Sequence, residues 1–167
     1  MINLDEVDFR LLEILQIDAS TPNQALAQAV KVSPPTALRR VRRLVENGLI
    51  ERRVALLSPS ALGALQALVE VQLDRQGAEH LDAFEALAVA DAAVQQCWRV
   101  SPGPEFMLVL WVADMAAYNA LVARLFTQDA NVRNVKTFFA TKRAKFEPRV
   151  DVRALAKGLS ASTRPGP

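Results

Sequence analysis

The sequence has very few of the residues from which cross-links and metal centres are built. Its 167 residues include one cysteine, Cys97, and one histidine, His80. A single cysteine cannot form an intramolecular disulfide, which is typical of proteins from a reducing compartment. One cysteine and one histidine are also too few for a zinc cluster. We therefore expect no metal, no cofactor and no structural cross-link.

Long apolar runs and a strong charge imbalance are also missing. The longest apolar stretch runs only from Phe106 to Ala113, whereas a membrane helix needs about 20 apolar residues. The first six residues carry acids and no basic stretch, unlike a secretory signal. We therefore expect a soluble cytoplasmic protein with no membrane partner. The net charge is only +2, so the positions of the charges matter more than their sum.

The N-terminal third has the periodicity of short helices. Apolar side chains recur at three- and four-residue intervals from Leu4 to Leu15, which predicts a first amphipathic helix. Asn23 is expected to cap a second helix over residues 24–30. Ser33 is expected to cap a third, which has proline at its first position and ends at Gly48. Three short helices joined by tight turns predict a helix-turn-helix.

The rest of the chain alternates between strand and helix patterns. An extended segment over residues 49–57, which carries Arg52 and Arg53, predicts a β wing followed by a linker. Beyond it we expect strands at 65–73, 94–101, 106–113 and 132–141, and helices at 79–89 and 115–126. This order is the βαββαβ pattern of a ferredoxin-like sheet. The predicted fold is α+β: a winged helix-turn-helix domain at 1–60, a ferredoxin-like domain at 64–148, and a tail at 149–167 with a disordered end.

The third helix carries the most distinctive chemistry. With about 100° of rotation per residue, one side collects the apolar residues Ala37, Leu38, Val41, Leu44 and Val45. The other side collects Ser33, Thr36, Arg39, Arg40, Arg42, Arg43 and Asn47. Arginine pairs with guanine edges and with phosphates, and hydroxyl groups contact either. The pattern therefore favours a recognition helix in the major groove of double-stranded DNA.

Individual roles follow from the position of each residue along this helix. The N-terminal residues of a recognition helix lie closest to the bases, so we expect Ser33, Pro35, Thr36 and Arg40 nearest the groove. We expect Arg39 and Arg43 to meet phosphates, and Arg42, near the core boundary, to pair with an acid of its own domain. The alternative is a solvated basic face on an ordinary helix. The two preceding helices and the tight turn favour the DNA interpretation.

Two stretches of the sequence resemble the Lrp/AsnC (leucine-responsive/asparagine regulator) family of transcription regulators. The first stretch is Leu4-Asp5-x-x-Asp8-x-x-Leu11-Leu12-x-x-Leu15-Gln16-x-Asp18. The second is Val32-Ser33-Pro34-x-x-x-Leu38-Arg39-Arg40-Val41-x-Arg43-Leu44-x-x-x-Gly48-Leu49-Ile50. The similarity continues to about Pro148 through Asp114-Met115-x-x-Tyr118 and the strand from Val132 to Thr137.

The resemblance implies a sequence-specific, non-enzymatic regulator that binds DNA as a homodimer, often assembled further into an octamer. It also implies that a strand pairs across the dimer and that a small effector, commonly a free amino acid, binds between dimers. The family's effector loop maps here onto Gly103, Pro104, Glu105 and Phe106, with Thr137 nearby. Glu105 would accept the ammonium of an amino acid, while loop N–H groups and Thr137 would donate to its carboxylate.

The chain departs from the family pattern in both domains. The loop Ser101-Pro102-Gly103-Pro104-Glu105-Phe106 has one acid fewer than the usual Gly-Asp-x-Asp. Lys31 stands where glycine is usual in the helix turn, and Ser20 where arginine is usual. These changes leave two other interpretations open, in which Glu105 is a solvated hairpin acid and Thr137 a plain strand residue.

A different function class is also open to this fold. Ferredoxin-like domains without DNA activity can serve as small-molecule-binding proteins or small enzymes. The sequence offers no nucleophile–base pair, metal cluster or glycine-rich phosphate loop for catalysis. An enzyme would also leave the arginine-rich helix unexplained. The basic stretch at 142–149 fits either contact with DNA flanks or a solvated surface.

Overall fold

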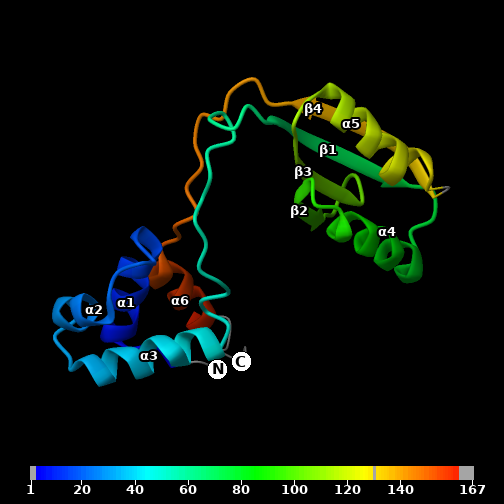
Figure 1. Ribbon diagram of the computed structural model, residues 1–167. Helices are drawn as coiled ribbons and strands as arrows, with labels where there is room; N and C mark the ends of the chain where they lie inside the picture. The colour runs from blue at the N-terminus through cyan, green and yellow to red at the C-terminus, as the bar shows by residue number, and fades with distance from the viewer. Residues whose placement is uncertain (1–2, 130, 162–167) are drawn as a thin grey trace, which may run out of the picture. The chain divides into compact units, whose positions relative to one another are not determined.

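The computed structural model describes residues 3–129 and 131–161, and the chain forms two compact units (Figure 1). Unit 1 combines Met1–Leu56 with Lys145–Pro167, and unit 2 is Leu57–Ala144. Unit 2 is therefore inserted into unit 1 along the sequence, and two connections join them. The predicted boundaries at 60, 64 and 148 differ from this division by a few residues. The main difference is that the C-terminal segment belongs with the N-terminal helices.

Unit 1 is a small helical domain. It contains α1 (Glu6–Ile17), α2 (Asn23–Ala29), α3 (Pro34–Glu46) and α6 (Val152–Ala161). Its core consists of Leu11, Leu12, Leu15, Leu26, Val30, Val41 and Leu44. Gly48 adopts φ +72° just after α3, as expected for the residue that ends this helix. The predicted cap of α2 was wrong, because Pro22 is the N-cap and Asn23 instead donates from Nδ2 to the Pro34 carbonyl at 2.8 Å.

Helix α6 was not predicted from the sequence. Val152 packs against the core of unit 1, and the Gln16 side chain pairs with the Val150 backbone, donating at 3.3 Å and accepting at 2.8 Å. The expected tail is therefore, up to residue 161, part of the helical domain. Residues 162–167, whose disorder was also predicted, lie outside the described residues.

The expected β wing is absent from the described segment 49–63, which contains no strand. Val54, Leu56 and Leu57 are 61%, 60% and 64% exposed there. A strand requires a second backbone to take its hydrogen bonds, and the described residues form no strand pairing with this segment.

Unit 2 has the ferredoxin-like order that the sequence predicted. Its elements are β1 (Leu65–Leu73), α4 (Ala78–Ala90), β2 (Val94–Arg99), β3 (Phe106–Val112), α5 (Met115–Val122) with the π-helical turn η1 (Ala123–Thr127), and β4 (Val132–Phe139). The strands form one antiparallel sheet in the order β2-β3-β1-β4. Helices α4 and α5 lie on the same face of this sheet (Figure 1).

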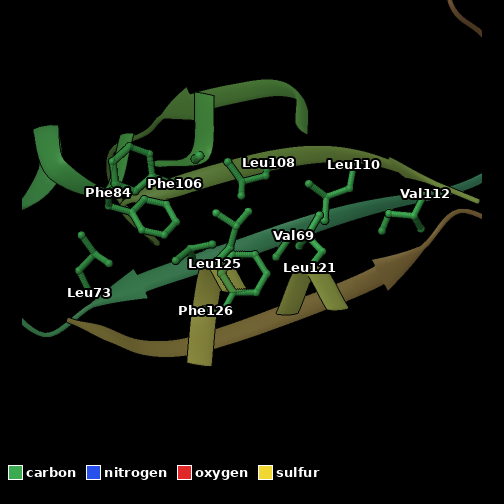
Figure 2. Packing of buried hydrophobic residues seen from close by; sticks show 13 residues of the cluster. Val69, Leu73, Phe84, Phe106, Leu108, Leu110, Val112, Leu121, Leu125 and Phe126 are labelled. Carbon is green, nitrogen blue, oxygen red and sulfur yellow. The ribbon is translucent and has the colours of Figure 1, made fainter. Parts of the chain in front are cut away.

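The helix-covered face of the sheet holds the core of unit 2. Alternate residues of β1, from Ala67 to Leu73, are buried, as the two-residue period of a strand requires. Figure 2 shows Val69 and Leu73 of this strand among the side chains of the core, which include Leu121. The ring centroids of Phe84 and Phe106 in this core are 4.9 Å apart. The open face exposes apolar side chains instead, since Leu68, Phe138 and Trp98 are 43%, 44% and 58% exposed.

Candidate nucleic-acid interface

The first helix begins with a reciprocal capping box. The Asp5 carboxylate accepts the Asp8 N–H at 3.0 Å, and the Asp8 carboxylate accepts the Asp5 N–H at 3.2 Å. Asp8 is fully buried. Because a buried carboxylate is costly unless it is hydrogen-bonded and paired, Asp8 requires cationic partners.

Two arginines of α3 supply those partners. Arg40 Nη1 donates to both Asp5 oxygens at 2.7 and 2.8 Å and to Asp8 at 3.0 Å, and Arg43 Nη2 donates to the other Asp8 oxygen. The hydrogen bond from Arg40 lowers the pKa of Asp5, and the hydrogen bond to Asp5 raises the pKa of Arg40. This ionic cluster fixes α3 against the start of α1.

Arg40, which we expected nearest the bases, lies at the edge of the buried stripe. The buried stripe of α3 is narrow and consists of Ala37, Val41 and Leu44. At about 100° per residue, Arg40 flanks this stripe rather than opposing it, and its side chain is only 22% exposed. Arg40 is a positioning residue for the helix.

The rest of the α3 surface differs from the prediction in two further ways. Leu38 and Val45 were expected in the core but are 49% and 43% exposed. Arg42 was expected to pair with an acid, yet Arg39 and Arg42 are exposed and have no ion-pair partner among residues 3–129 and 131–161. The two unpaired guanidinium groups lie one turn apart on this free face of α3.

The turn that leads into α3 has a constrained backbone. Lys31, which occupies the usual glycine position, adopts φ +57°. Ser33 is the N-cap, but its Oγ lies 2.8 Å from Thr36 Oγ1 instead of capping an N–H group. Ser33 and Pro35 are exposed and Thr36 is half-buried. All three lie at the end of α3 where contact with bases was predicted.

The residues predicted to bind an effector lie apart in a single chain. Glu105 precedes β3 and Thr137 lies on β4, on opposite sides of β1. The Glu105 carboxylate accepts from the Leu73 N–H at 2.8 Å and from Gln76 Nε2 at 2.5 Å. Thr137 Oγ1 accepts from the Tyr118 hydroxyl at 2.7 Å. Within one chain, the side chains of Glu105 and Thr137 therefore have separate hydrogen-bond partners.

The remaining effector candidates have different environments. Phe106 is fully buried in the core of unit 2, where its ring packs against Phe84. Gly103 is exposed with φ +128°, a conformation that favours glycine, and Pro104 is half-buried beside it. Within the described residues, no three His, Cys, Asp or Glu side chains gather as metal ligands.

Both units match families of known domains. Residues 4–45 match the AsnC-type helix-turn-helix domain, and residues 66–150 match the Lrp/AsnC ligand binding domain. The chain belongs to the Lrp/AsnC family. Among its relatives, the leucine-responsive regulatory protein of Rhizobium meliloti is 35% identical over 152 residues, 90% of this chain and 97% of the relative. The Bkd operon transcriptional regulator of Pseudomonas aeruginosa is 35% identical over 85% of this chain and 94% of its own length.

Two solved structures of transcription regulators share this fold over most of the chain. An AsnC family regulator from Agrobacterium tumefaciens has a TM-score of 0.82 at 28% identity, covering 91% of this chain and 99% of the other. A transcriptional regulator from Neisseria meningitidis, in complex with L-methionine, has a TM-score of 0.83 at 26% identity, covering 92% and 99%.

Membership in the Lrp/AsnC family decides between the function classes left open by the sequence. The protein is a DNA-binding transcription regulator with a ligand-binding domain, and it is not an enzyme. No helix in the described part of the chain is long and apolar enough to cross a membrane.

Sequence reasoning missed the environments of three residues in the helical unit of this Lrp/AsnC chain. Asp8 organises the arginines of α3, and the Asp5-x-x-Asp8 spacing of a capping box was a usable signal for it. Leu38 was assigned to the core because it is apolar. Arg153, on the unpredicted α6, donates to Glu6 and Glu13 of α1. No sequence pattern signalled this contact, because it joins residues 140 positions apart.

Proposed function

We propose that this regulator binds the major groove of its operator through the free face of α3, with Arg39 and Arg42 as the main cationic contacts. The observation that carries the proposal is the difference in pairing among the four arginines of this helix. Arg40 and Arg43 are held by Asp5 and Asp8, whereas Arg39 and Arg42 face away from the core without partners in the described chain. Unpaired guanidinium groups on a recognition helix suit phosphates and guanine edges.

The other predicted residues fit around this pair. Ser33, Pro35 and Thr36 lie at the N-terminal end of α3, which reaches deepest into the groove in this type of motif. Arg43 is 44% exposed while it holds Asp8, so a phosphate contact at the edge of the interface is compatible with its ion pair. Such a regulator works where the chromosome lies, and we expect it in the cytoplasm.

The test is a salt titration of binding to the DNA upstream of the protein's own gene, measured by fluorescence anisotropy. Removing one arginine that meets a phosphate should lower the slope of log K against log salt by about 1. Arg39→Ala and Arg42→Ala should each weaken binding and reduce this slope. Arg133→Ala, an exposed arginine on β4, is the matched control and should leave it unchanged. If the salt slopes of Arg39→Ala and Arg42→Ala equalled that of Arg133→Ala, the two arginines would not be the cationic contacts to DNA.

We also propose that the chain acts as a homodimer, which associates further into octamers. The open face of the sheet supports the dimer. Leu68, on β1, lies opposite Val109 of β3 and opposite Phe138 of β4. The three side chains form an apolar row across three neighbouring strands. The exposed segment with Val54 and Leu56 offers a second surface, which a strand of another copy would pair with.

For the effector, we propose an amino acid bound where copies of unit 2 meet. Glu105 is half-buried, and its carboxylate is already oriented by the Leu73 N–H. Its contact with Gln76 can be exchanged for a ligand ammonium. The hydroxyl pair of Tyr118 and Thr137 offers donors for a carboxylate. The L-methionine complex of the Neisseria meningitidis regulator supports this ligand class.

Calorimetric titration of the full-length protein with a panel of L-amino acids tests the effector proposal. At least one should bind, and Glu105→Gln should weaken binding while keeping the acceptor for the Leu73 N–H. Thr137→Val removes a hydroxyl that we propose donates to the ligand carboxylate, and it should also weaken binding. Binding of no amino acid, with DNA binding intact, would refute the ligand class and leave the DNA interface standing.

A further inference from the structure

The free face of α3 carries an apolar side chain as well as cations. Leu38 is 49% exposed, although its apolar character predicted a place in the core. It lies about 90° around the helix from the buried stripe, at about 100° per residue. Its neighbours one turn away are Pro35, which is exposed, and Arg42, which has no partner in the described chain. Leu38 is therefore part of the surface assigned above to the DNA.

The position of Leu38 along α3 limits what it can touch. It is the fifth residue of the helix, within the N-terminal half that enters the groove. A major groove presents one apolar group at its floor, the C5-methyl of thymine, and the rest are hydrogen-bond donors and acceptors. A leucine offers neither donor nor acceptor. The thymine methyl is therefore the group in the groove that matches it.

We infer that Leu38 is a specificity-determining residue that packs on the C5-methyl of a thymine in each operator half-site. The inference rests on the proposed docking of α3 and deepens it. Arg42, one turn further along the helix, contacts the duplex beside that thymine, and Pro35 extends the apolar surface toward the start of the helix. Val45, two turns after Leu38, lies near the helix end that leaves the groove and makes no such contact.

The decisive experiment changes only the methyl group. The operator is first defined by footprinting with the full-length protein. Each thymine of a half-site is then replaced in turn by uracil, which pairs identically but lacks the C5-methyl. Burial of one methyl group is expected to give a factor of about three to five in affinity. One uracil position should weaken binding of the wild-type protein by that factor.

A double-mutant cycle links that position to Leu38. Leu38→Ala should bind thymine and uracil operators equally at that position. Val45→Ala, the matched exposed aliphatic control on the same helix, should keep the full uracil penalty. Arg42→Ala should also keep the penalty while it reduces the salt slope.

Three outcomes would overturn the inference. In the first, no uracil substitution affects the wild-type protein, although that protein footprints its operator. In the second, Leu38→Ala retains the uracil penalty. In the third, Val45→Ala removes the uracil penalty as fully as Leu38→Ala does, which would mean that the effect is not specific to Leu38. Failure of the DNA proposal itself would appear separately, as unchanged salt slopes in Arg39→Ala and Arg42→Ala.

Discussion

Two backbone positions of the helical unit adopt the same left-handed conformation, but only one of them is occupied by glycine. Lys31 and Gly48 bracket α3, and both adopt positive φ, at +57° and +72°. A non-glycine residue in this left-handed region is disfavoured by about 1–2 kcal/mol, whereas glycine enters it freely. The turn before α3 therefore contains local strain that the turn after α3 avoids.

We predict that Lys31→Gly stabilises the protein and that Gly48→Ala destabilises it. Relief of the left-handed strain at Lys31 is partly offset by the extra freedom of glycine in the unfolded chain, so the gain should stay below about 1 kcal/mol. Gly48→Ala meets no atom within 4 Å of the new Cβ, so its loss of about 1 kcal/mol reflects φ alone. Urea unfolding measures both. A loss of stability in Lys31→Gly would show that the lysine side chain matters more than its backbone.

The Asp5–Arg40 pair predicts how acid affects the helical unit. The hydrogen bond from Arg40, with the Asp8 N–H next, lowers the pKa of Asp5 below its ordinary value of 3.8. The unfolded chain therefore binds more protons than the folded one between the folded pKa and 3.8. The stabilisation by this pair is complete above pH 3.8 and is lost as pH falls through the folded pKa.

Asp5→Asn isolates this charge, because asparagine is an equally good N-cap. We expect the variant to be less stable than the wild type at neutral pH and to lose less stability on acidification. Urea unfolding over a pH series, followed by helical circular dichroism, measures the difference. Asp114→Asn, which changes the N-cap of α5 where no arginine joins the cap in the described chain, should show a smaller change of slope. Parallel pH profiles for wild type and Asp5→Asn would contradict the assignment.

At the scale of elements, periodicity predicted most of the fold because burial follows it closely. The β1 strand occupies Leu65–Leu73 as expected, since its alternate residues enter the core. The faces of α3 were less predictable. A helix of 13 residues with apolar residues over a wide arc does not reveal which of them its neighbours cover. Leu38 and Arg40 were misplaced for that reason, and the ionic cluster with Asp8 depends on a partner 32 residues away.

Helix α6 shows another limit of sequence reading, because its attachment depends on contacts between the two ends of the chain. Arg153 donates to both Glu6 oxygens at 2.7 and 2.8 Å and to Glu13 at 2.6 Å. Its guanidinium lies 5.2 Å from the centre of the Phe9 ring. These contacts of Arg153, together with the packing of Val152 against the core, hold α6 beside α1.

We predict that Arg153→Ala releases α6 from α1. Hydrogen exchange over residues 150–156 should become faster, because the backbone there would open more often. Arg149→Ala is a matched control, since Arg149 pairs with Glu147, two residues away. It should leave the exchange rates of α6 near those of the wild type. Equal exchange in wild type and Arg153→Ala would show that the apolar contact of Val152 is sufficient.

At the scale of the whole molecule, the order of segments couples the two units. The ligand-binding unit is inserted between two segments of the helical unit, so both of its ends continue into the domain that carries α3. We therefore expect a change in how copies of unit 2 associate to reach the helical unit through both connections. Reciprocal coupling then requires that DNA also alters the affinity for the effector.

The open sheet face provides the test of assembly. We predict that Leu68→Lys, at the centre of the apolar row with Val109 and Phe138, converts the proposed dimer into a monomer. A specific interface buries about 800 Å² on each partner, and a charge at its centre would be left without a counter-ion. Sedimentation should show the mass of a single chain, with unchanged helical circular dichroism.

The same variant should also bind its operator more weakly, because a monomer loses the gain from engaging two half-sites at once. Leu87→Lys provides a matched control, since Leu87 is 49% exposed on α4, on the opposite side of the sheet. It should keep both the mass and the affinity of the wild type. If Leu68→Lys kept its mass, the copies would have to associate through another surface, and the exposed segment around Val54 and Leu56 would be the next to substitute.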